Sequence, residues 1–253
     1  MMSARFPDLE GKVVLITGGG SGIGAHLVRG FAEQGAAVAF FDIADDPSRA
    51  LEQELKQAGH QVAYQHCDLT DIPAVQAGIA RVRERFGPIG VLINNAAHDQ
   101  RHDIHDVTPE YWDERFAVNL KHQFFCAQAV HDDMKQLGGG SIINMGSTSW
   151  IIGVGTMPCY TTAKSAVEGL TRSLARAFGP DNIRVNTVLP GWIITKRQEE
   201  LWLDAEGEKS IFENQCLQRK LRPEDLVGPI LFLASDAAAA CTNQRFIVDG
   251  GWV

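Results

Sequence analysis

Residues 13–24 read VVLITGGGSGIG, an apolar, β-branched run followed directly by a glycine-rich loop. Residues 13–16 are apolar on both faces, which is typical of a parallel strand covered by helices on each side. A helix is predicted from Ala25 to about Gln34, so its first free N–H groups lie beside the glycines, where the backbone can turn tightly around an anion. The order strand, loop, helix therefore predicts a pyrophosphate cradle, with a Gly-rich turn that binds nothing as the alternative.

Short apolar runs alternate with helical patterns along the rest of the chain. Further strands are predicted at residues 38–41, 62–64, 91–93, 141–145, 185–189 and 246–248. Helices are predicted at residues 75–86, 108–127, 167–178 and from Pro223 onwards. Because parallel strands need crossover helices, this alternation predicts a doubly wound α/β fold over residues 1–253, as one domain.

One region departs from the alternation. Residues 192–221 mix charged side chains with Trp192, Trp202 and Phe212 and contain no clean strand pattern. Long insertions in compact domains are usually functional. We interpret the segment as a substrate lid, with a plain surface excursion as the equal alternative.

Composition narrows the class of protein. The 253 residues are 45% hydrophobic and 21% charged, which excludes a disordered chain. The net charge is -8 and no Lys/Arg-rich run occurs, so we expect no nucleic-acid partner. No apolar stretch approaches the ~18–20 residues of a membrane span. The five cysteines are scattered without a Cys-x-x-Cys pair, which favours reduced thiols in a cytoplasmic protein and no metal site.

Acidic residues after the second and third strands point to the adenosine half of a dinucleotide. Asp42 ends the second predicted strand, where a carboxylate can accept hydrogen bonds from ribose hydroxyls and repels a 2′-phosphate. No Arg or Lys occupies the glycine loop or the two positions after Asp42. The sequence therefore favours NAD over NADP, with a solvated strand-end acid as the alternative.

Asp68, beside Leu69, is a candidate acceptor for the adenine amino group or a cap of the following helix. The loop candidates for the pyrophosphate are Gly18, Ser21, Gly22, Ile23 and Gly24.

Tyr160 and Lys164 are four residues apart and so share one helix face. A nearby cation, Lys164 together with an oxidised nicotinamide, would favour the phenolate. A fall of ~2–3 units in the pKa of Tyr160 would make it a working base for an alcohol proton. Ser147 follows the predicted strand 141–145, where its hydroxyl could hold a substrate oxygen beside Tyr160; Ser149 is the second candidate. The alternatives are a surface pair without a role and a serine that bonds only its own turn.

Other polar and aromatic residues are weaker candidates. Asn95 and Ala96 follow the fourth strand and are placed to line a cofactor cleft, or only to stabilise a turn. Asn119 is a poor helix residue that could bond a water or be buried for structural reasons.

After Ala96, His98 and Asp99 are interpreted as contacts to sugar hydroxyls. The rest of the run to His102 is interpreted as a solvated loop. Trp150 and Trp192 are candidates to stack on a sugar ring, with ordinary packing as the alternative.

Together these residues resemble the short-chain dehydrogenase/reductase family over essentially the whole chain. The matching positions are Thr17, Gly18, Gly22, Gly24, Asp68, Asn94, Asn95, Ala96, Asn119, Ser147, Tyr160, Lys164, Pro190, Gly191 and Thr195. The resemblance implies a Rossmann-type sheet of about seven strands with helices on both faces. It implies a catalytic set of Asn119, Ser147, Tyr160 and Lys164, in which Tyr160 is the acid/base and Asn119 supports a water.

The resemblance also assigns the nicotinamide end and the assembly. The backbone around Pro190, Gly191 and Ile193 and the side chain of Thr195 would meet the nicotinamide amide. The family commonly forms homotetramers through the helices that contain Asn119 and Tyr160.

Within this family the chain is most similar to bacterial D-xylose and related aldose 1-dehydrogenases, on stretches such as residues 41–45, 111–115 and 195–199. This predicts NAD-dependent oxidation of the anomeric hydroxyl of a pentose, hexose or deoxysugar to a lactone. The alternatives are an NAD-linked dehydrogenase of another secondary alcohol, a 3-ketoacyl-type reductase, which Asp42 disfavours, and a non-catalytic dinucleotide sensor.

Overall fold

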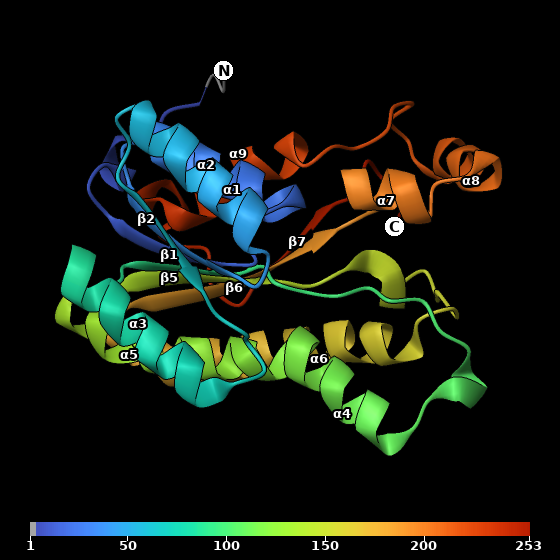
Figure 1. Ribbon diagram of the computed structural model, residues 1–253, viewed down its shortest axis with the longest axis horizontal. Helices are drawn as coiled ribbons and strands as arrows, with labels where there is room; N and C mark the ends of the chain where they lie inside the picture. The colour runs from blue at the N-terminus through green and yellow to red at the C-terminus, as the bar shows by residue number, and fades with distance from the viewer. Residues whose placement is uncertain (1–3) are drawn as a thin grey trace.

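A sheet of seven parallel strands forms the centre of this computed structural model, which describes residues 4–253. The spatial order is β3-β2-β1-β4-β5-β6-β7, so the direction of travel reverses between β1 and β4 (Figure 1). The strands are β1 Val13–Thr17, β2 Ala37–Asp42, β3 Val62–His66, β4 Val91–Asn94, β5 Gly140–Met145, β6 Ile183–Pro190 and β7 Arg245–Val248. This confirms the predicted doubly wound α/β fold with all seven predicted strands. In such sheets the ligand crevice lies at the carboxyl ends of the strands, at the point of reversal.

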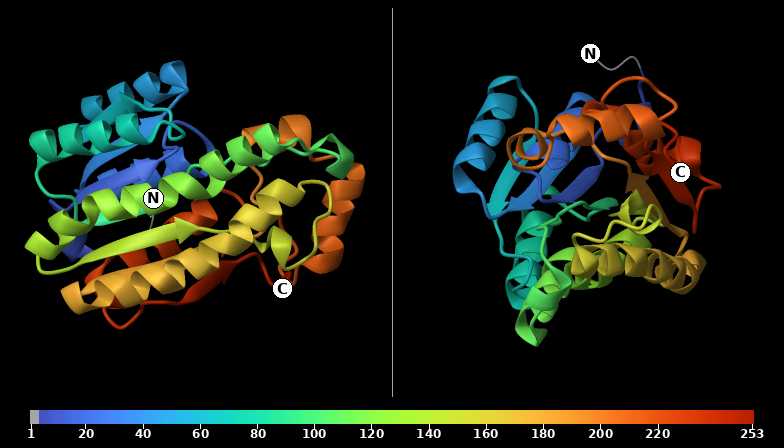
Figure 2. Two further views of the ribbon diagram at one scale, coloured as in Figure 1. Left: turned by 90° about the horizontal axis from the view of Figure 1, so that it is seen from below. Right: turned by 90° about the vertical axis from the view of Figure 1, so that its right-hand side faces the viewer.

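Helices cover both faces of the sheet (Figures 1 and 2). The helices are α1 Gly22–Glu33, α2 Asp45–Gln57, α3 Ile72–Phe86, α4 Pro109–Phe116, α5 His122–Gln136, α6 Pro158–Phe178, α7 Lys196–Leu201, α8 Ala205–Asn214 and α9 Glu224–Ala234. Apolar residues of α1, α2 and α9 form one buried cluster with the sheet, and those of α3, α5 and α6 form the other.

Burial of β1 on both faces of the sheet explains why its sequence is apolar throughout. Val14 and Ile16 belong to one buried cluster, and Val13 and Leu15 belong to the other. All four side chains are at most 7% exposed. Because successive strand residues point to opposite faces, only an uninterrupted apolar run can serve two cores at once.

The predicted helix over 108–127 is confirmed, but it contains a π turn. Its start is confirmed, since Thr108 Oγ1 accepts a hydrogen bond from Tyr111 N at 3.2 Å. A π-helical turn at Ala117–Lys121 then separates α4 from α5. Phe124, just beyond this turn, is 41% exposed. Single π turns of this kind occur mostly at functional sites.

The segment 192–221 folds into α7 and α8 and lies beyond the carboxyl ends of the strands (Figures 1 and 2). Its only strand-like pairing among the described residues is the bridge between Ile193 and Leu221. This position puts the segment over the crevice that the strand order defines. Across residues 4–253, every helix is too short or too polar to cross a bilayer.

Candidate active site

A cleft of about 1390 Å³ opens at the carboxyl ends of the strands. Almost all the predicted site residues line it, although they come from seven separate stretches of chain. Those lining residues are Gly18, Ser21, Gly22, Ile23, Gly24, Asp42, Asp68, Leu69, Asn95, Ala96, His98, Asp99, Ser147, Ser149, Tyr160, Lys164, Pro190, Gly191, Trp192, Ile193 and Thr195. Asn119 and Trp150 are the two predicted residues that do not line this cleft.

The glycine loop is shaped by close backbone contacts. Gly18 has φ +66° and Gly22 has φ +50°, in the region that favours glycine. A Cβ on Gly24 would lie 1.8 Å from Gly18 O, so no side chain fits between the loop and α1. Asn95 Nδ2 donates to both Thr17 O and Gly18 O at 2.9 Å, which fixes the loop to the end of β4. The N-cap of α1 makes no side-chain hydrogen bond, which leaves the first N–H groups of the helix for an anion.

Asp42 lies at the edge of this loop with its carboxylate held by backbone donors. Its Oδ2 accepts from Gly20 N at 2.8 Å and its Oδ1 accepts from Ala44 N at 2.9 Å. Between residues 18 and 70, no cationic side chain lines the cleft. This end of the cleft is therefore acidic and suits ribose hydroxyls better than a further phosphate.

Asp68 also lines the cleft, and the structure decides between its two predicted roles. The cap of α3 is Asp71, whose carboxylate accepts from Ala74 N at 3.0 Å. Asp68 instead accepts from the backbone N and the hydroxyl of Thr70, at 2.9 and 2.8 Å. The helix-capping alternative is thus wrong, and the adenine contact stays a prediction.

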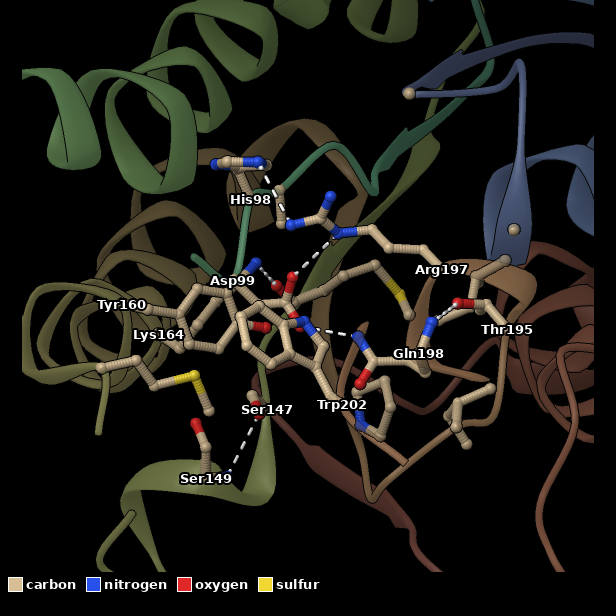
Figure 3. A pocket seen from close by; sticks show the side chains of 18 of the residues that line it. His98, Asp99, Ser147, Ser149, Tyr160, Lys164, Thr195, Arg197, Gln198 and Trp202 are labelled. Carbon is tan, nitrogen blue, oxygen red and sulfur yellow. Dashed lines mark hydrogen bonds and ion pairs between the residues drawn. The ribbon is translucent and has the colours of Figure 1, made fainter. Parts of the chain in front are cut away.

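Tyr160 and Lys164 face the cleft from the first turns of α6 (Figure 3). Lys164 Nζ donates to Met145 O at 2.7 Å and lies 5.7 Å from the centre of the Tyr160 ring. Lys164 is only 1% exposed, and this burial lowers its pKa to about 7, against the opposing charge of Asp99. The pair that the spacing predicted is therefore assembled at the strand ends.

In the chain by itself the pKa of Tyr160 is raised; the predicted fall depends on an oxidised nicotinamide as well as on Lys164 and stays a prediction. Burial raises the pKa of Tyr160, the charge of Asp99 raises it further, and a hydrogen bond with Ser147 opposes both. The main cause is the burial of the phenol itself. Burial also lowers the pKa of Lys164 to about 7, so its side chain is only partly protonated near neutral pH.

Ser147 and Ser149 begin the short turn after β5. Ser147 Oγ accepts from Ser149 N at 3.1 Å and also bonds Tyr160, so it does more than close its own turn. Ser149 is 5% exposed, and its hydroxyl has no hydrogen-bond partner within residues 4–253. Figure 3 shows both serines on the side of the cleft near Tyr160.

Asn119 lies in the π turn, behind the cleft, and holds the backbone of His98. Its Oδ1 accepts from His98 N at 2.9 Å, and its Nδ2 donates to His98 O at 3.2 Å and to Arg115 O at 2.9 Å. These contacts fit the structural alternative for Asn119. Its support of a water stays a prediction.

His98 and Asp99 face two side chains of α7 that the sequence reading missed, Arg197 and Gln198 (Figure 3). Gln198 Nε2 donates to Asp99 Oδ2 at 2.7 Å, and Arg197 Nε lies 3.5 Å from Asp99 Oδ1. Arg115 donates to His98 Nδ1. Burial, followed by the charges of Arg115 and Arg197, lowers the pKa of His98, so the imidazole is neutral at neutral pH.

Of the two tryptophans predicted to stack on a sugar, one lines the cleft and the other does not. Trp192 lines the cleft, and its Nε1 donates to Gln198 Oε1 at 2.9 Å. Trp150 faces a separate pocket of about 290 Å³ and lies under Arg245, 5.3 Å from the ring centre, so the packing alternative fits it better. Arg101, predicted to lie in a solvated loop, covers the ring of Trp202 at 4.5 Å and lines the cleft. The polar run Lys196–Glu200, which lies between Trp192 and Trp202 in the sequence, was the available signal for α7.

Comparison with known proteins agrees with this geometry. A family model described as enoyl-(acyl carrier protein) reductase matches residues 18–253. The chain is 52% identical over 252 residues to the D-xylose 1-dehydrogenase of Caulobacter vibrioides, with 100% of both chains covered. It is 51% identical over 250 residues to a Rhizobium meliloti protein named probable galactose dehydrogenase, with 98% of both covered.

Solved structures give the same result. A short-chain dehydrogenase/reductase from Serratia marcescens has a TM-score of 0.90 and 31% identity, covering 97% of this chain and 99% of that one. The chain belongs to the short-chain dehydrogenase/reductase family, oxidoreductases of alcohol groups that use a nicotinamide dinucleotide.

Proposed function

We propose that the chain is an NAD-dependent aldose 1-dehydrogenase that oxidises the anomeric hydroxyl of a pentose, hexose or deoxysugar to the lactone. The observation that carries the proposal is the meeting, in one cleft, of Tyr160 and Ser147 with the polar residues His98 and Asp99. The first two suit proton transfer at an alcohol, and the others suit a substrate with several hydroxyls. The names of the two relatives that are about half identical to this chain support a sugar substrate.

The residues of the cleft fit a dinucleotide. The glycine loop and the uncapped start of α1 would hold the pyrophosphate, and Asp42 and Asp68 would hold the adenosine. A nicotinamide dinucleotide held by these residues would supply the acceptor for the hydride of the anomeric carbon. The acidic adenosine end supports NAD over NADP, since a 2′-phosphate would lie against Asp42 without a cation to pair with.

Tyr160 is the proposed base. Its phenolate oxygen takes the proton of the anomeric hydroxyl while the C–O bond of the substrate becomes a carbonyl. Ser147 donates to that same substrate oxygen and keeps it beside the phenol. Because burial and then Asp99 raise the pKa of Tyr160, we expect oxidation to be faster in mildly alkaline solution.

The substrate contacts are proposed from the other wall of the cleft. Asp99 accepts from a sugar hydroxyl, His98 donates to one, and Trp192 covers the apolar side of the ring. Ser149 supplies a hydroxyl that has no partner within the described chain. Trp150 is left out of this set because it lines a different pocket.

Association into a homotetramer through α5 and α6 is part of the proposal. The exposed Phe124 on α5 supports it, because a large apolar side chain that is 41% exposed gains from burial between subunits. Light scattering on the purified protein would give the mass of the assembly directly.

A substrate screen tests the proposed function. Formation of reduced nicotinamide would be followed by absorbance with pentoses, hexoses and deoxysugars, and with non-sugar secondary alcohols and ketoacyl compounds as comparison sets. Each would be run with both cofactors. We expect the highest kcat/KM with an aldose and NAD. A better non-sugar alcohol would contradict the sugar assignment, and NAD binding without any turnover would favour the dinucleotide sensor.

A further inference from the structure

A chain of hydrogen bonds joins α7 to two residues of the cleft that are far away in sequence. Gln198 Nε2 donates to Asp99 Oδ2 at 2.7 Å, and Trp192 Nε1 donates to Gln198 Oε1 at 2.9 Å. A single amide therefore fixes the acid after β4 and the indole after β6. Figure 3 shows the first of these contacts reaching across the cleft.

The chemistry of this position requires an amide. A carboxylate can only accept and an indole N–H can only donate, so the residue between them must donate at one end and accept at the other. Gln198 has both groups on one planar unit. A carboxylate at the same place would repel Asp99, and an apolar side chain would leave both partners unsatisfied.

The backbone of Gln198 is equally fixed. Its N–H donates to Thr195 Oγ1 at 3.3 Å, and its C=O accepts from Trp202 N at 3.0 Å and from Leu203 N at 2.8 Å. The same residue thus closes the start and the end of α7. The backbone of Gln198 is therefore held at both ends of α7, and the hydrogen bonds to Asp99 and Trp192 hold the side-chain amide against rotation about its own bonds.

Beside this amide, two hydrogen-bond donors face each other and mark a position for an acceptor oxygen of the substrate. Arg115 donates to His98 Nδ1, which places the imidazole proton on Nε2. Arg197 Nη2 lies 3.4 Å from that Nε2, so two N–H donors face one another. Such a pair is satisfied when one acceptor oxygen in the cleft receives hydrogen bonds from both donors. Asp99 lies next to it, 3.5 Å from Arg197 Nε, and offers an acceptor for a neighbouring hydroxyl.

We propose that Gln198 is a positioning residue that determines sugar specificity: it holds Asp99 and Trp192 as the two walls between which the sugar is recognised. The inference rests on the proposed function and deepens it by naming a lid residue that orders the substrate site. Gln198 acts through Asp99 and Trp192 and takes no part in proton transfer. Its loss should therefore weaken sugar binding and leave NAD binding intact.

The test compares Gln198→Glu with the matched control Gln218→Glu, which makes the same change at an exposed side chain of the same segment, outside the cleft. We expect Gln198→Glu to raise KM for the best sugar at least tenfold at pH 8, with KM for NAD changed less than twofold. The effect should shrink towards pH 5.5, because protonation of the introduced carboxyl removes its repulsion from Asp99. The control should match the wild type at both pH values.

A double variant separates positioning from direct contact. In Asp99→Asn combined with Gln198→Glu, the amide of residue 99 donates to the carboxylate of residue 198, so the hydrogen bond is restored in the opposite direction. We expect the KM for the sugar to fall below that of Gln198→Glu alone. An unchanged sugar KM in Gln198→Glu, or a loss that is equal at both pH values and not reduced in the double variant, would overturn the inference. If the wild type oxidises no sugar, it is the proposed function that has failed.

Discussion

At the adenosine end of the cleft, Asp42 holds a carboxylate between two backbone donors, Gly20 N and Ala44 N. Replacing Asp42 by Asn keeps the shape and removes the charge that would repel a 2′-phosphate. We expect the ratio of kcat/KM with NAD to that with NADP to fall at least tenfold, or about 1.4 kcal/mol. Steady-state kinetics with each cofactor measures the ratio.

Asp45→Asn is the matched control for this change. Asp45 is the next acid along the chain but does not line the cleft, and it bonds the hydroxyl of Tyr64 at 2.6 Å. Its replacement should leave the ratio within twofold of the wild type. An unchanged ratio in Asp42→Asn would show that this carboxylate does not select the cofactor.

At the residue scale, the sequence predicted the groups whose spacing is local and missed those whose partners are remote. Tyr160 and Lys164 share a helix face, and the structure brings Ser147 to them from the adjacent strand end. Gln198 could not be predicted, because its role depends on contacts with Asp99, 99 residues away in sequence. The raised pKa of Tyr160 also depends on burial, which no four-residue spacing describes.

At the element scale, the glycine loop packs so closely against α1 that no side chain fits between them at Gly24. Gly24→Ala would place a Cβ 1.8 Å from Gly18 O, so the loop must move. We expect a loss of about 1–3 kcal/mol in the free energy of unfolding, as for other overpacked sites, and a larger Kd for NAD. Urea unfolding and fluorescence titration measure the two effects.

Gly169→Ala serves as the comparison, since a Cβ there meets nothing within 4 Å and the residue lies inside α6. It should retain wild-type stability and NAD affinity. Equal behaviour of the two alanine variants would show that the close approach of loop and helix does not govern the site.

Helices and strands could be predicted from the sequence where a single physical rule determines their residue pattern. All seven strands were predictable, because burial on both faces requires continuous apolar runs, as in β1. The π turn between α4 and α5 was not predictable from the sequence. Asn119 lies in this turn, donates to Arg115 O and exchanges hydrogen bonds with His98, a tertiary contact that helical periodicity does not describe.

At the scale of the whole molecule, the buried Lys164 links the active site to stability. Its pKa falls from 10.5 to about 7 on folding, so between these values the unfolded chain holds a proton that the folded protein has released. Stability therefore rises with pH over this window. Relative to Lys164→Met, the free energy of unfolding of the wild type should increase from pH 7 to pH 10, by up to about 1.4 kcal/mol per pH unit.

Denaturant unfolding of both proteins at three pH values in this window gives the difference. The slope is the informative part, since a lysine that folding keeps as a cation stays protonated in both states and leaves the difference flat over this window. A difference that stays flat from pH 7 to pH 10 would contradict the burial of an uncharged Lys164.

The account of the whole protein depends on the phenol of Tyr160 accepting a proton from the sugar. The most direct measurement is turnover of Tyr160→Phe with saturating sugar and NAD, beside Tyr111→Phe, which removes a phenol hydroxyl outside the cleft. We expect kcat to fall by about 10²–10⁴-fold in Tyr160→Phe, with the Kd for NAD within twofold of the wild type and Tyr111→Phe nearly unchanged. A Tyr160→Phe enzyme that keeps more than a tenth of wild-type turnover would contradict the account.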